Sequence, residues 1–484
     1  MRILIACSWS LPHAGGVNTY VNQLSKGLQL AGHHVDIFSP TPDGQGFHVP
    51  GKSLFIDKSK LTSLIADQAS LYMNHYLPGT DPWITSTEIE RYCIEAAALY
   101  FDLSDYDIIH AQDIVSAHAL SRVKSPRTPL VTTIHGCLTK EWFVKLKEMG
   151  LLEQDTNTPL WHYSAIRENL GATVSDVTIS PSQWLKDVLV NEFSVPEHSI
   201  TVSHYGFDID EFLQNMNRES NVTRPAEKKV FMCPARFDVV KGQIHLIYAL
   251  AKLKEERTDW ICWFVGDGFL REEITQTANN LGLTDHVIFM GNREDVPELL
   301  RQADFVVLPS MQDNQPFVII EAQIAGKPVI TSDAGGIPEM VTHSSTGLVF
   351  HAGDRDQLFH CLRSALDEDD STSLIELANH AKRWGEEHWS LHAMTERVVD
   401  LYNLAKSKHP EIDNGISLQP IQPIQPIQPT QPTQIIQPVQ PVQPVQRKKK
   451  KGRSKWRILR RRRYQIALKI RKRKNRKRRL AKRR

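Results

Sequence analysis

Met1-Arg-Ile-Leu-Ile-Ala-Cys7 and the turn His13-Ala-Gly-Gly-Val17 decide the fold class of this chain. Residues 3–6 are a short apolar run of the kind that forms a buried strand. A helical spacing of apolar residues follows the turn at 18–31, and 33–38 has the pattern of a second strand. This order predicts a βαβ unit, which implies a parallel sheet with ligands at the carboxyl ends of its strands.

The same alternation of strands and helices continues along the chain and restarts once. The first half has further predicted strands at 107–111, 130–135, 177–180 and 200–204. A polar segment at 215–229 has the composition of a linker. Beyond the linker, strands are predicted at 230–234, 260–265, 287–290, 305–308 and 328–331. We therefore expect an α/β protein with two Rossmann-like doubly wound domains that face a cleft, where chemistry should take place.

The C-terminal part of the chain has a different character. Gln-Pro-Ile, Gln-Pro-Thr and Gln-Pro-Val triplets favour polyproline II, so 411–446 is expected to be a semi-rigid spacer. The last segment, 447–484, holds 24 Lys and Arg residues and no Asp or Glu. The formal net charge of the 484 residues is only +3, because 1–446 carries 34 basic against 55 acidic residues. An acidic body is thus followed by a disordered extension with a cationic tail.

Cysteine usage and hydropathy restrict the location. The six cysteines are scattered without a Cys-x-x-Cys pair, which argues for a reducing compartment and against a disulfide framework or structural zinc. The apolar run at the start is too short for a signal-peptide core, and no stretch reaches about 18 consecutive apolar residues. We therefore expect a cytoplasmic protein without a membrane span.

Two pairs of charged residues follow predicted strands, and Glu321 of the second pair falls in the helix after the turn. Arg236 and Lys241 follow the strand at 230–234 and precede a helix, and a guanidinium with an ammonium at such a place suits a diphosphate. Asp313 and Glu321 are carboxylates that can accept hydrogen bonds from the hydroxyl groups of a sugar and a ribose. Each residue alone could instead be a solvated loop charge or an acid that stabilises a helix dipole. Their combination favours a binding site.

An ordered set of motifs carries a resemblance to a known family. The motifs are Arg236…Lys241, Val265-Gly-Asp-Gly268, Phe289-Met-Gly291, Ala303-Asp-Phe-Val-Val-Leu-Pro-Ser310, Glu321-Ala322, Ala325-Gly-Lys-Pro-Val-Ile330 and Gly335-Gly-Ile-Pro-Glu339. This set closely resembles the retaining glycosyltransferases of family 4 (glycosyl transferases group 1), which have the GT-B fold. Gly15-Gly16 and Thr132-Thr-Ile-His-Gly136 are similar to that family too. The likeness covers about residues 1–405, and the order of the motifs is more specific than any one of them.

The resemblance implies a division of the chain. Its parts are an N-terminal acceptor domain at 1–214, the linker at 215–229, a nucleotide-sugar-binding domain at 230–390, a helix returning to the first domain at 391–410, the spacer at 411–446 and the polybasic tail at 447–484. Trp389 and Tyr402 fall where the family's last helix crosses back, and we expect them to pack rather than to act in chemistry.

The resemblance also implies roles for the site residues. Arg236 and Lys241 would bind the donor's diphosphate and neutralise the leaving group, Asp313 would hold the donor sugar and Glu321 the ribose. His135 would face the donor sugar near the scissile bond, with a buried histidine at a strand end as the alternative. The remaining donor-binding residues are Gly15 and Gly16, whose backbone N–H groups can approach phosphates, and Phe317 and Val318.

This chain departs from the family pattern at two places. The family commonly has Glu at the position of Asp313 and Phe-Gly at the position of Pro316-Phe317. A shorter carboxylate moves the sugar anchor by about one methylene group. We interpret the departures as altered sugar selection rather than lost activity.

The implied reaction is transfer of a glycosyl group, of the hexosyltransferase type, from a nucleotide-diphosphate sugar to a hydroxyl acceptor with retention of anomeric configuration. No metal or cofactor is expected, because the two cations can stabilise the leaving group. A hydride-transfer enzyme is disfavoured because Gly-x-Gly-x-x-Gly is absent after the first strand. Two alternatives stay open, a nucleotide-sugar epimerase and a surface or coat-associated binding protein that retains an inactive glycosyltransferase scaffold.

The expected partners are a nucleotide sugar and a glycan or lipid-linked acceptor, in cell-surface or envelope glycan synthesis. For the tail we rank an anionic membrane or envelope polymer above nucleic acid, because the acceptors of such enzymes usually reside there. Peripheral attachment at the inner membrane face, or at an envelope or coat surface, is the corresponding expectation for location.

Overall fold

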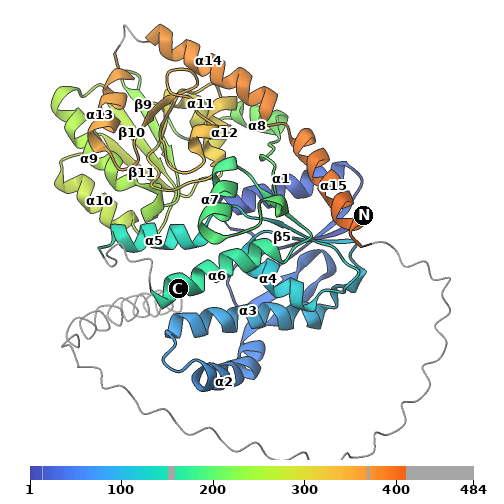
Figure 1. Cartoon of the computed structure of the whole chain (residues 1–484). Helices are drawn as coiled ribbons and strands as arrows, with labels where there is room; N and C mark the ends of the chain where they lie inside the picture. Colours follow the sequence, from blue (N-terminus) through green and yellow to red (C-terminus); the bar gives the residue numbers. More distant parts are fainter. Residues whose placement is uncertain (14, 151–157, 368–370, 410–484) are drawn as a thin grey trace, which may run out of the picture. The chain divides into compact units, whose positions relative to one another are not determined.

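The computed structural model describes residues 1–13, 15–150, 158–367 and 371–409 (Figure 1). The predicted spacer at 411–446 and the polybasic tail at 447–484 lie outside the described residues. The described part contains two β-sheets with helices packed on them. We call the residues around the first sheet the first lobe and those around the second sheet the second lobe.

The first sheet has eight strands in the order β4-β3-β2-β1-β5-β6-β7-β8. Its strands are β1 (Arg2–Ala6), β2 (His34–Pro40), β3 (Gly46–Val49), β4 (Leu54–Asp57), β5 (Ile108–Ala111), β6 (Leu130–Thr133), β7 (Val177–Ser180) and β8 (Ile200–Val202). All six predicted strands are confirmed and run parallel, whereas β3 and β4 add an antiparallel extension to β2. Sequence analysis missed these two because they lie in or directly after the Pro- and Gly-rich stretch 40–52, which has the composition of a loop.

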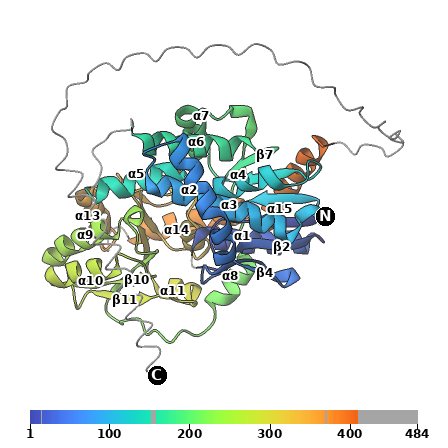
Figure 2. The same ribbon diagram turned by 90° about the horizontal axis from the view of Figure 1, so that it is seen from below.

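Both faces of β1 are buried, which explains its uninterrupted apolar sequence. Ile3 and Ile5 belong to one core cluster with residues of α1 (Gly16–Leu30) and α15 (Leu391–Ser407). Leu4 and Ala6 belong to another cluster with residues of α3 (Pro82–Phe101) and α4 (Ile114–Val123). Side chains of a strand alternate between the two faces of its sheet. The first sheet is therefore a layer between two sets of helices (Figures 1 and 2).

The second sheet has six parallel strands in the order β11-β10-β9-β12-β13-β14. They are β9 (Lys229–Pro234), β10 (Trp260–Val265), β11 (Val287–Gly291), β12 (Phe305–Leu308), β13 (Val329–Ser332) and β14 (Leu348–Phe350). The five predicted strands are confirmed, but the expectation that 328–331 completes the sheet is wrong. β14 extends it by a three-residue edge strand inside the stretch 342–354, whose polar residues and glycines are typical of a loop.

The helices follow the doubly wound pattern of both halves. In the first lobe they are α1 (Gly16–Leu30), α2 (Lys58–Tyr76), α3 (Pro82–Phe101), α4 (Ile114–Val123), α5 (Leu138–Glu148), α6 (Pro159–Thr173) and α7 (Gln183–Phe193). In the second lobe they are α9 (Gln243–Glu256), α10 (Arg271–Asn280), α11 (Val296–Gln302), α12 (Phe317–Ile324), α13 (Arg355–Ser364) and α14 (Ser371–His388). No helix in the described part of the chain has the length and apolar content that a bilayer span requires.

Two more helices connect the lobes. α8 (Ile209–Met216) packs on α11 and α12, while Glu211 pairs with Lys26 of α1. α15 (Leu391–Ser407) packs on α1, β6 and β7. Its Tyr402 hydroxyl contacts His110 Nδ1 at 2.7 Å, and Trp389 before it donates from Nε1 to Gln323 Oε1 at 2.7 Å. Both aromatic side chains are buried, so their observed role is structural.

Candidate active site

Four of the predicted site residues line one cavity between the lobes. His135 follows β6 in the first lobe, whereas Arg236, Lys241 and Asp313 follow β9 and β12 in the second. The cavity has a volume of about 90 Å³, and its walls are His135, Gly136, Glu141, Trp184, Arg236, Val240, Lys241, Gln312, Asp313 and Asn314. This volume suits a phosphate or a hydroxyl-bearing group rather than a whole nucleotide sugar, whose remaining parts would lie outside it.

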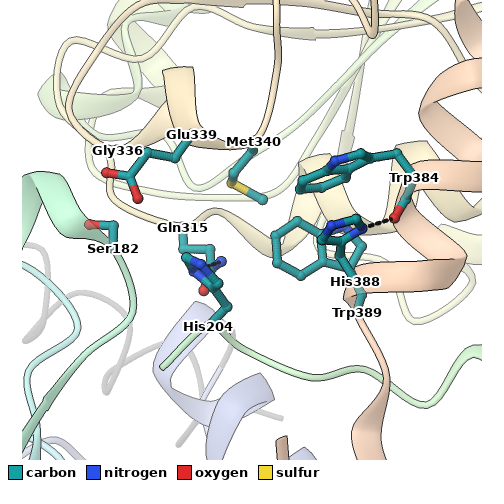
Figure 3. A pocket seen from close by; sticks show the side chains of 9 residues that line it. All are labelled: Ser182, His204, Gln315, Gly336, Glu339, Met340, Trp384, His388 and Trp389. Atoms are coloured by element: carbon teal, nitrogen blue, oxygen red, sulfur yellow. Dashed lines mark hydrogen bonds between the residues drawn. The ribbon is translucent and has the colours of Figure 1, made fainter. Parts of the chain in front are cut away.

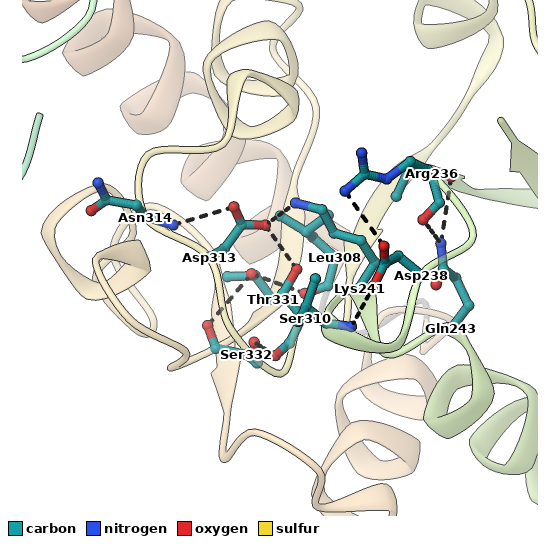
Figure 4. A network of polar contacts seen from close by, with 12 residues as sticks. Arg236, Asp238, Lys241, Gln243, Leu308, Ser310, Asp313, Asn314, Thr331 and Ser332 are labelled. Atoms are coloured by element: carbon teal, nitrogen blue, oxygen red, sulfur yellow. Dashed lines mark hydrogen bonds and ion pairs between the residues drawn. The ribbon is translucent and has the colours of Figure 1, made fainter. Parts of the chain in front are cut away.

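The two cations of this cavity differ in how firmly they are held (Figure 4). Lys241 ends a single turn of 3-10 helix, Val239–Lys241, in which the Asp238 carboxylate accepts a hydrogen bond from the Val240 N–H group. Its Nζ atom lies 2.5 Å from Asp313 Oδ2, and its side chain is largely buried. The Arg236 side chain is 52% exposed, and its Nη2 atom lies 3.5 Å from Asp238 Oδ2. The ammonium is therefore preorganised, whereas the guanidinium is free to adjust to an anion.

Asp313 is the centre of a polar network in the loop after β12. Its Oδ2 atom accepts a hydrogen bond from Ser310 Oγ at 3.0 Å besides pairing with Lys241, and Oδ1 accepts from the Asn314 N–H group at 3.2 Å. The carboxylate is thus oriented from two sides (Figure 4). It can receive a sugar hydroxyl group through lone pairs that these bonds leave available.

Glu321 lies apart from Asp313 and is not in the wall of the cavity. It sits in the middle of α12, partly exposed, and its carboxylate makes no hydrogen bond or ion pair to the residues that the structure describes. Burial raises the pKa of Glu321 to about 7. A half-buried acceptor without a protein partner is suited to a ligand hydroxyl group. The placement of the two carboxylates is thus consistent with separate ligands for each.

The start of α12 meets the Gly-rich turn of the first lobe. Phe317 is buried and stacks on Tyr205, with ring centroids 5.0 Å apart and an interplanar angle of 5°. A Cβ atom added at Gly16 would lie 3.9 Å from Phe317 Cδ2. Four residues predicted to bind the donor therefore lie near the junction of the lobes: Gly15, Gly16, Phe317 and Val318. The Phe317 side chain itself packs against Tyr205.

His135 is held by hydrogen bonds at both ring nitrogens. Nε2 lies 3.1 Å from Gln112 Oε1, whose amide nitrogen donates to the His110 carbonyl, so Nε2 carries the proton. Nδ1 then accepts from the Tyr205 hydroxyl at 2.6 Å. Burial lowers the pKa of His135 to about 3, so the ring is neutral near pH 7. His135 is thus both a lining residue and a fixed, hydrogen-bonded histidine, and it is poorly placed for proton transfer.

Sequence analysis missed the way in which the loop 312–315 joins the lobes. Asn314 Nδ2 donates to the His135 carbonyl at 3.0 Å, and Gln312 Nε2 donates to the Cys137 carbonyl at 3.4 Å. Gln315 Oε1 accepts from the Tyr205 N–H group at 2.8 Å. Three side-chain carboxamides of a predicted donor-binding loop therefore form hydrogen bonds to the main chain of the first lobe. Their partners lie more than 100 residues away, and no local pattern could have revealed them.

A second, smaller cavity lies between the lobes on the side of α14 (Figure 3). Its volume is about 40 Å³, and it is lined by Ser182, His204, Gln315, Gly336, Glu339, Met340, Trp384, His388 and Trp389. Glu339 accepts hydrogen bonds from the N–H groups of Gln183 at 2.9 Å and Trp184 at 2.6 Å, at the start of α7. A carboxylate is favourable at a helix N-terminus. This cavity is too small for a nucleotide, and its walls connect the lobes.

Comparison with known proteins identifies the family. Residues 14–211 match the family model described as Glycosyltransferase Family 4, and residues 216–388 match the model described as Glycosyl transferases group 1. The chain belongs to the group 1 glycosyltransferases. The predicted resemblance, and with it the expectation of sugar transfer, is confirmed.

Relatives of this glycosyltransferase include the D-inositol 3-phosphate glycosyltransferase of Corynebacterium kroppenstedtii, which is 26% identical over 420 residues, or 83% of this chain and 88% of the relative. The glycogen synthase of Mycobacterium tuberculosis is 27% identical over 379 residues, or 76% and 86%. HepE of Anabaena, solved in complex with UDP, has a TM-score of 0.56 at 20% identity, over 83% of this chain and 100% of that one. The predicted GT-B architecture, two Rossmann-like domains, is thereby confirmed.

Proposed function

We propose that this glycosyltransferase moves a hexosyl group from a nucleoside diphosphate sugar to a hydroxyl acceptor with retention of anomeric configuration, without a metal or cofactor. The observation that carries the proposal is the pair formed by Lys241 and Asp313, which lies with Arg236 in one cavity. Support for the donor class comes from HepE of Anabaena, which has been solved with UDP and with UDP-glucose.

Donor binding would exchange the partners of the Lys241–Asp313 pair. The diphosphate would compete for the Lys241 ammonium, and Arg236 would turn toward it, since charge-assisted contacts to phosphate are strong. Asp313 Oδ2 would then be released for the hydroxyl groups of the donor sugar. Glu321 would hold the ribose, and the backbone of Gly15 and Gly16 would approach the phosphates.

The reaction would break the bond between the anomeric carbon and the diphosphate oxygen. The acceptor oxygen would form its bond on the same face of the sugar, and the acceptor proton would leave with the nucleoside diphosphate. The two cations would stabilise the negative charge that develops on the leaving group. His135 would shape the sugar site through its fixed ring.

The place of action is proposed from the tail. The segment 447–484 would attach the enzyme to an anionic membrane or envelope polymer, where a glycan or lipid-linked acceptor is made. Nucleic acid ranks below these partners. The corresponding role is in cell-surface or envelope glycan synthesis, with the enzyme on the cytoplasmic side.

The test is turnover with a panel of UDP-glucose, GDP-mannose and ADP-glucose, followed by Lys241→Ala. The wild type should hydrolyse or transfer from one donor, and product analysis should show retention. Lys241→Ala should lower turnover at least about a hundredfold, because the developing charge loses its fixed counter-ion. Lys252→Ala removes an exposed lysine of α9 that pairs with Asp356, and it should change nothing.

Absence of turnover with every donor, in a protein that still binds one of them, would favour the inactive scaffold. Conversion of the donor into its sugar epimer without an acceptor would favour the epimerase. Wild-type turnover by Lys241→Ala would show that the diphosphate site lies elsewhere.

A further inference from the structure

Glu141 is a carboxylate in the cavity that no predicted role explains. It belongs to α5 of the first lobe, and it lines the same cavity as Arg236, Lys241 and Asp313 of the second lobe. Within the part of the chain that the structure describes, its carboxylate makes no hydrogen bond and no ion pair. Burial raises the pKa of Glu141, while the charges of Lys145, Lys241 and Arg236 lower it.

Gly136 provides a second observation about the same carboxylate. A Cβ atom at residue 136 would lie 2.9 Å from Glu141 Oε1, which is closer than Cβ contacts allow. Gly136 is not among the glycines with a left-handed backbone, so its own conformation does not call for glycine. The space that a side chain would need at residue 136 is the space that the Glu141 carboxylate occupies.

The position of Glu141 limits what it can bind. Its negative charge would repel a phosphate group at this place, and the cations that would attract one are on the second lobe. Among the described residues no cation lies within pairing distance of Glu141. Glu141 is therefore not the structural counter-ion of Arg236 or of Lys241. A half-buried carboxylate that pairs with no protein group can accept hydrogen bonds from donors that enter the cavity. Sugar hydroxyl groups are the donors that this reaction would bring into the cavity.

We propose that Glu141 is a specificity-determining carboxylate of the transfer site that accepts a hydrogen bond from a sugar hydroxyl group, and that residue 136 is glycine to leave room for it. The inference rests on the proposed function and adds a ligand from the first lobe to the residues of the second. The hydroxyl group can belong to the donor sugar or to the acceptor, and the experiment distinguishes these sources.

The experiment compares Glu141→Ala, Gly136→Ala and the double variant with the wild type. The control is Glu148→Gln, on the same helix but not in the cavity wall. Calorimetry measures affinity for UDP and UDP-glucose, or for the corresponding GDP or ADP pair if the wild type selects it. Turnover is measured with the same donor. Thermal unfolding verifies the fold, which Gly136→Ala should retain because only the end of a flexible side chain has to move.

Glu141→Ala should bind the nucleoside diphosphate as tightly as the wild type or more tightly, since a negative charge is removed from beside the phosphates. Its turnover should fall roughly ten- to a hundredfold, as for a lost hydrogen bond to a charged group. Gly136→Ala should lower turnover by displacing the carboxylate, and it should have no further effect in the Glu141→Ala background. Weaker binding of UDP-glucose at unchanged UDP affinity assigns the hydroxyl to the donor; a raised acceptor KM assigns it to the acceptor.

Wild-type turnover by Glu141→Ala would overturn the proposal. It would also be overturned if Gly136→Ala lowered turnover in the Glu141→Ala background as much as it does in the wild type. A wild type that binds none of the three nucleoside diphosphates would overturn the proposed function instead, and this inference with it.

Discussion

Among single residues, Glu168 of α6 contacts the start of α5, the helix that contributes Glu141 to the cavity. Its Oε1 atom accepts from the Thr139 N–H group at 2.7 Å and from the Cys137 thiol at 3.6 Å, at the start of the helix that carries Glu141. Its Oε2 atom is buried without a partner. Burial raises the pKa of Glu168 to about 7 against the lowering effect of these bonds and of the Arg167 charge.

This pKa predicts a pH-dependent stability. Between the ordinary carboxyl pKa and about 7, folded Glu168 keeps a proton that the unfolded chain releases, so its contribution to stability falls as pH rises. Glu168→Gln lacks this titration. From pH 5 to pH 8 its free energy of unfolding relative to the wild type should therefore rise by up to roughly 3 kcal/mol.

Denaturant unfolding of both proteins across this range provides the measurement. Burial lowers the pKa values of His110 and His135 to about 3, so these residues make the protein more stable as pH rises. Both proteins contain them, so their contribution cancels in the difference between the two free energies of unfolding. The buried amide nitrogen of Gln adds only a constant offset. A difference that does not change with pH would show that Glu168 is ionised in the folded protein.

Among the elements, α15 depends on a close approach to α1. A Cβ atom at Gly27 of α1 would overlap the Thr395 hydroxyl group of α15. Thr395 Oγ1 itself donates to the Leu391 carbonyl at 2.8 Å, so it cannot easily turn away. Small residues where two helices cross let their backbones come close, and this crossing places Tyr402 against His110.

Gly27→Ala should therefore destabilise the protein by about 1–3 kcal/mol, because overpacking outweighs the better helix propensity of alanine. Adding Thr395→Ala removes the overlapping hydroxyl, and the double variant should regain most of the loss. Thermal unfolding of the two single variants and the double variant measures this. Equal destabilisation with and without Thr395→Ala would place the cause outside the α1–α15 contact.

At the scale of the whole molecule, the site depends on contacts between the lobes. Asn314 donates to the His135 carbonyl, and Glu339 binds the start of α7. Lys145 of α5 pairs with Asp238 at 3.1 Å, beside Arg236. The residues that we propose to bind the donor and the residues that join the lobes are therefore neighbours in the same loops. Donor binding and lobe arrangement should for this reason be coupled.

The polybasic tail at 447–484 predicts membrane binding that can be separated from catalysis. Truncation after Asn414 should leave turnover with a soluble acceptor unchanged, because the described site residues all precede it. It should abolish binding to vesicles that contain anionic lipid, since each basic residue contributes about 1 kcal/mol near such a surface. Sedimentation with vesicles at low and high salt measures the difference, which should be largest at low salt.

Vesicle binding that survives truncation would move the surface site to the folded lobes. A full-length chain that ignores vesicles but binds RNA or DNA would give the tail a nucleic-acid partner instead.

Local patterns along the chain were sufficient to predict the fold class and the family. Buried parallel strands appear as local apolar runs, and the turns after them, such as those with Gly15 and Arg236, are local as well. Eleven strands could thus be predicted, while β3, β4 and β14 lie in or beside stretches with the composition of loops. Four predicted site residues meet in one cavity because the carboxyl ends of parallel strands lie at the same edge of a sheet.

The side chains that face one another across the lobes could not be predicted from any local pattern. Glu141 and Asp313 are 172 positions apart, and their meeting depends on how two separately formed sheets pack. The same holds for the fixed ring of His135 and for the carboxamides of 312–315. Local sequence determines local conformation, whereas the neighbours of a side chain between two lobes are set by the packing of the whole molecule.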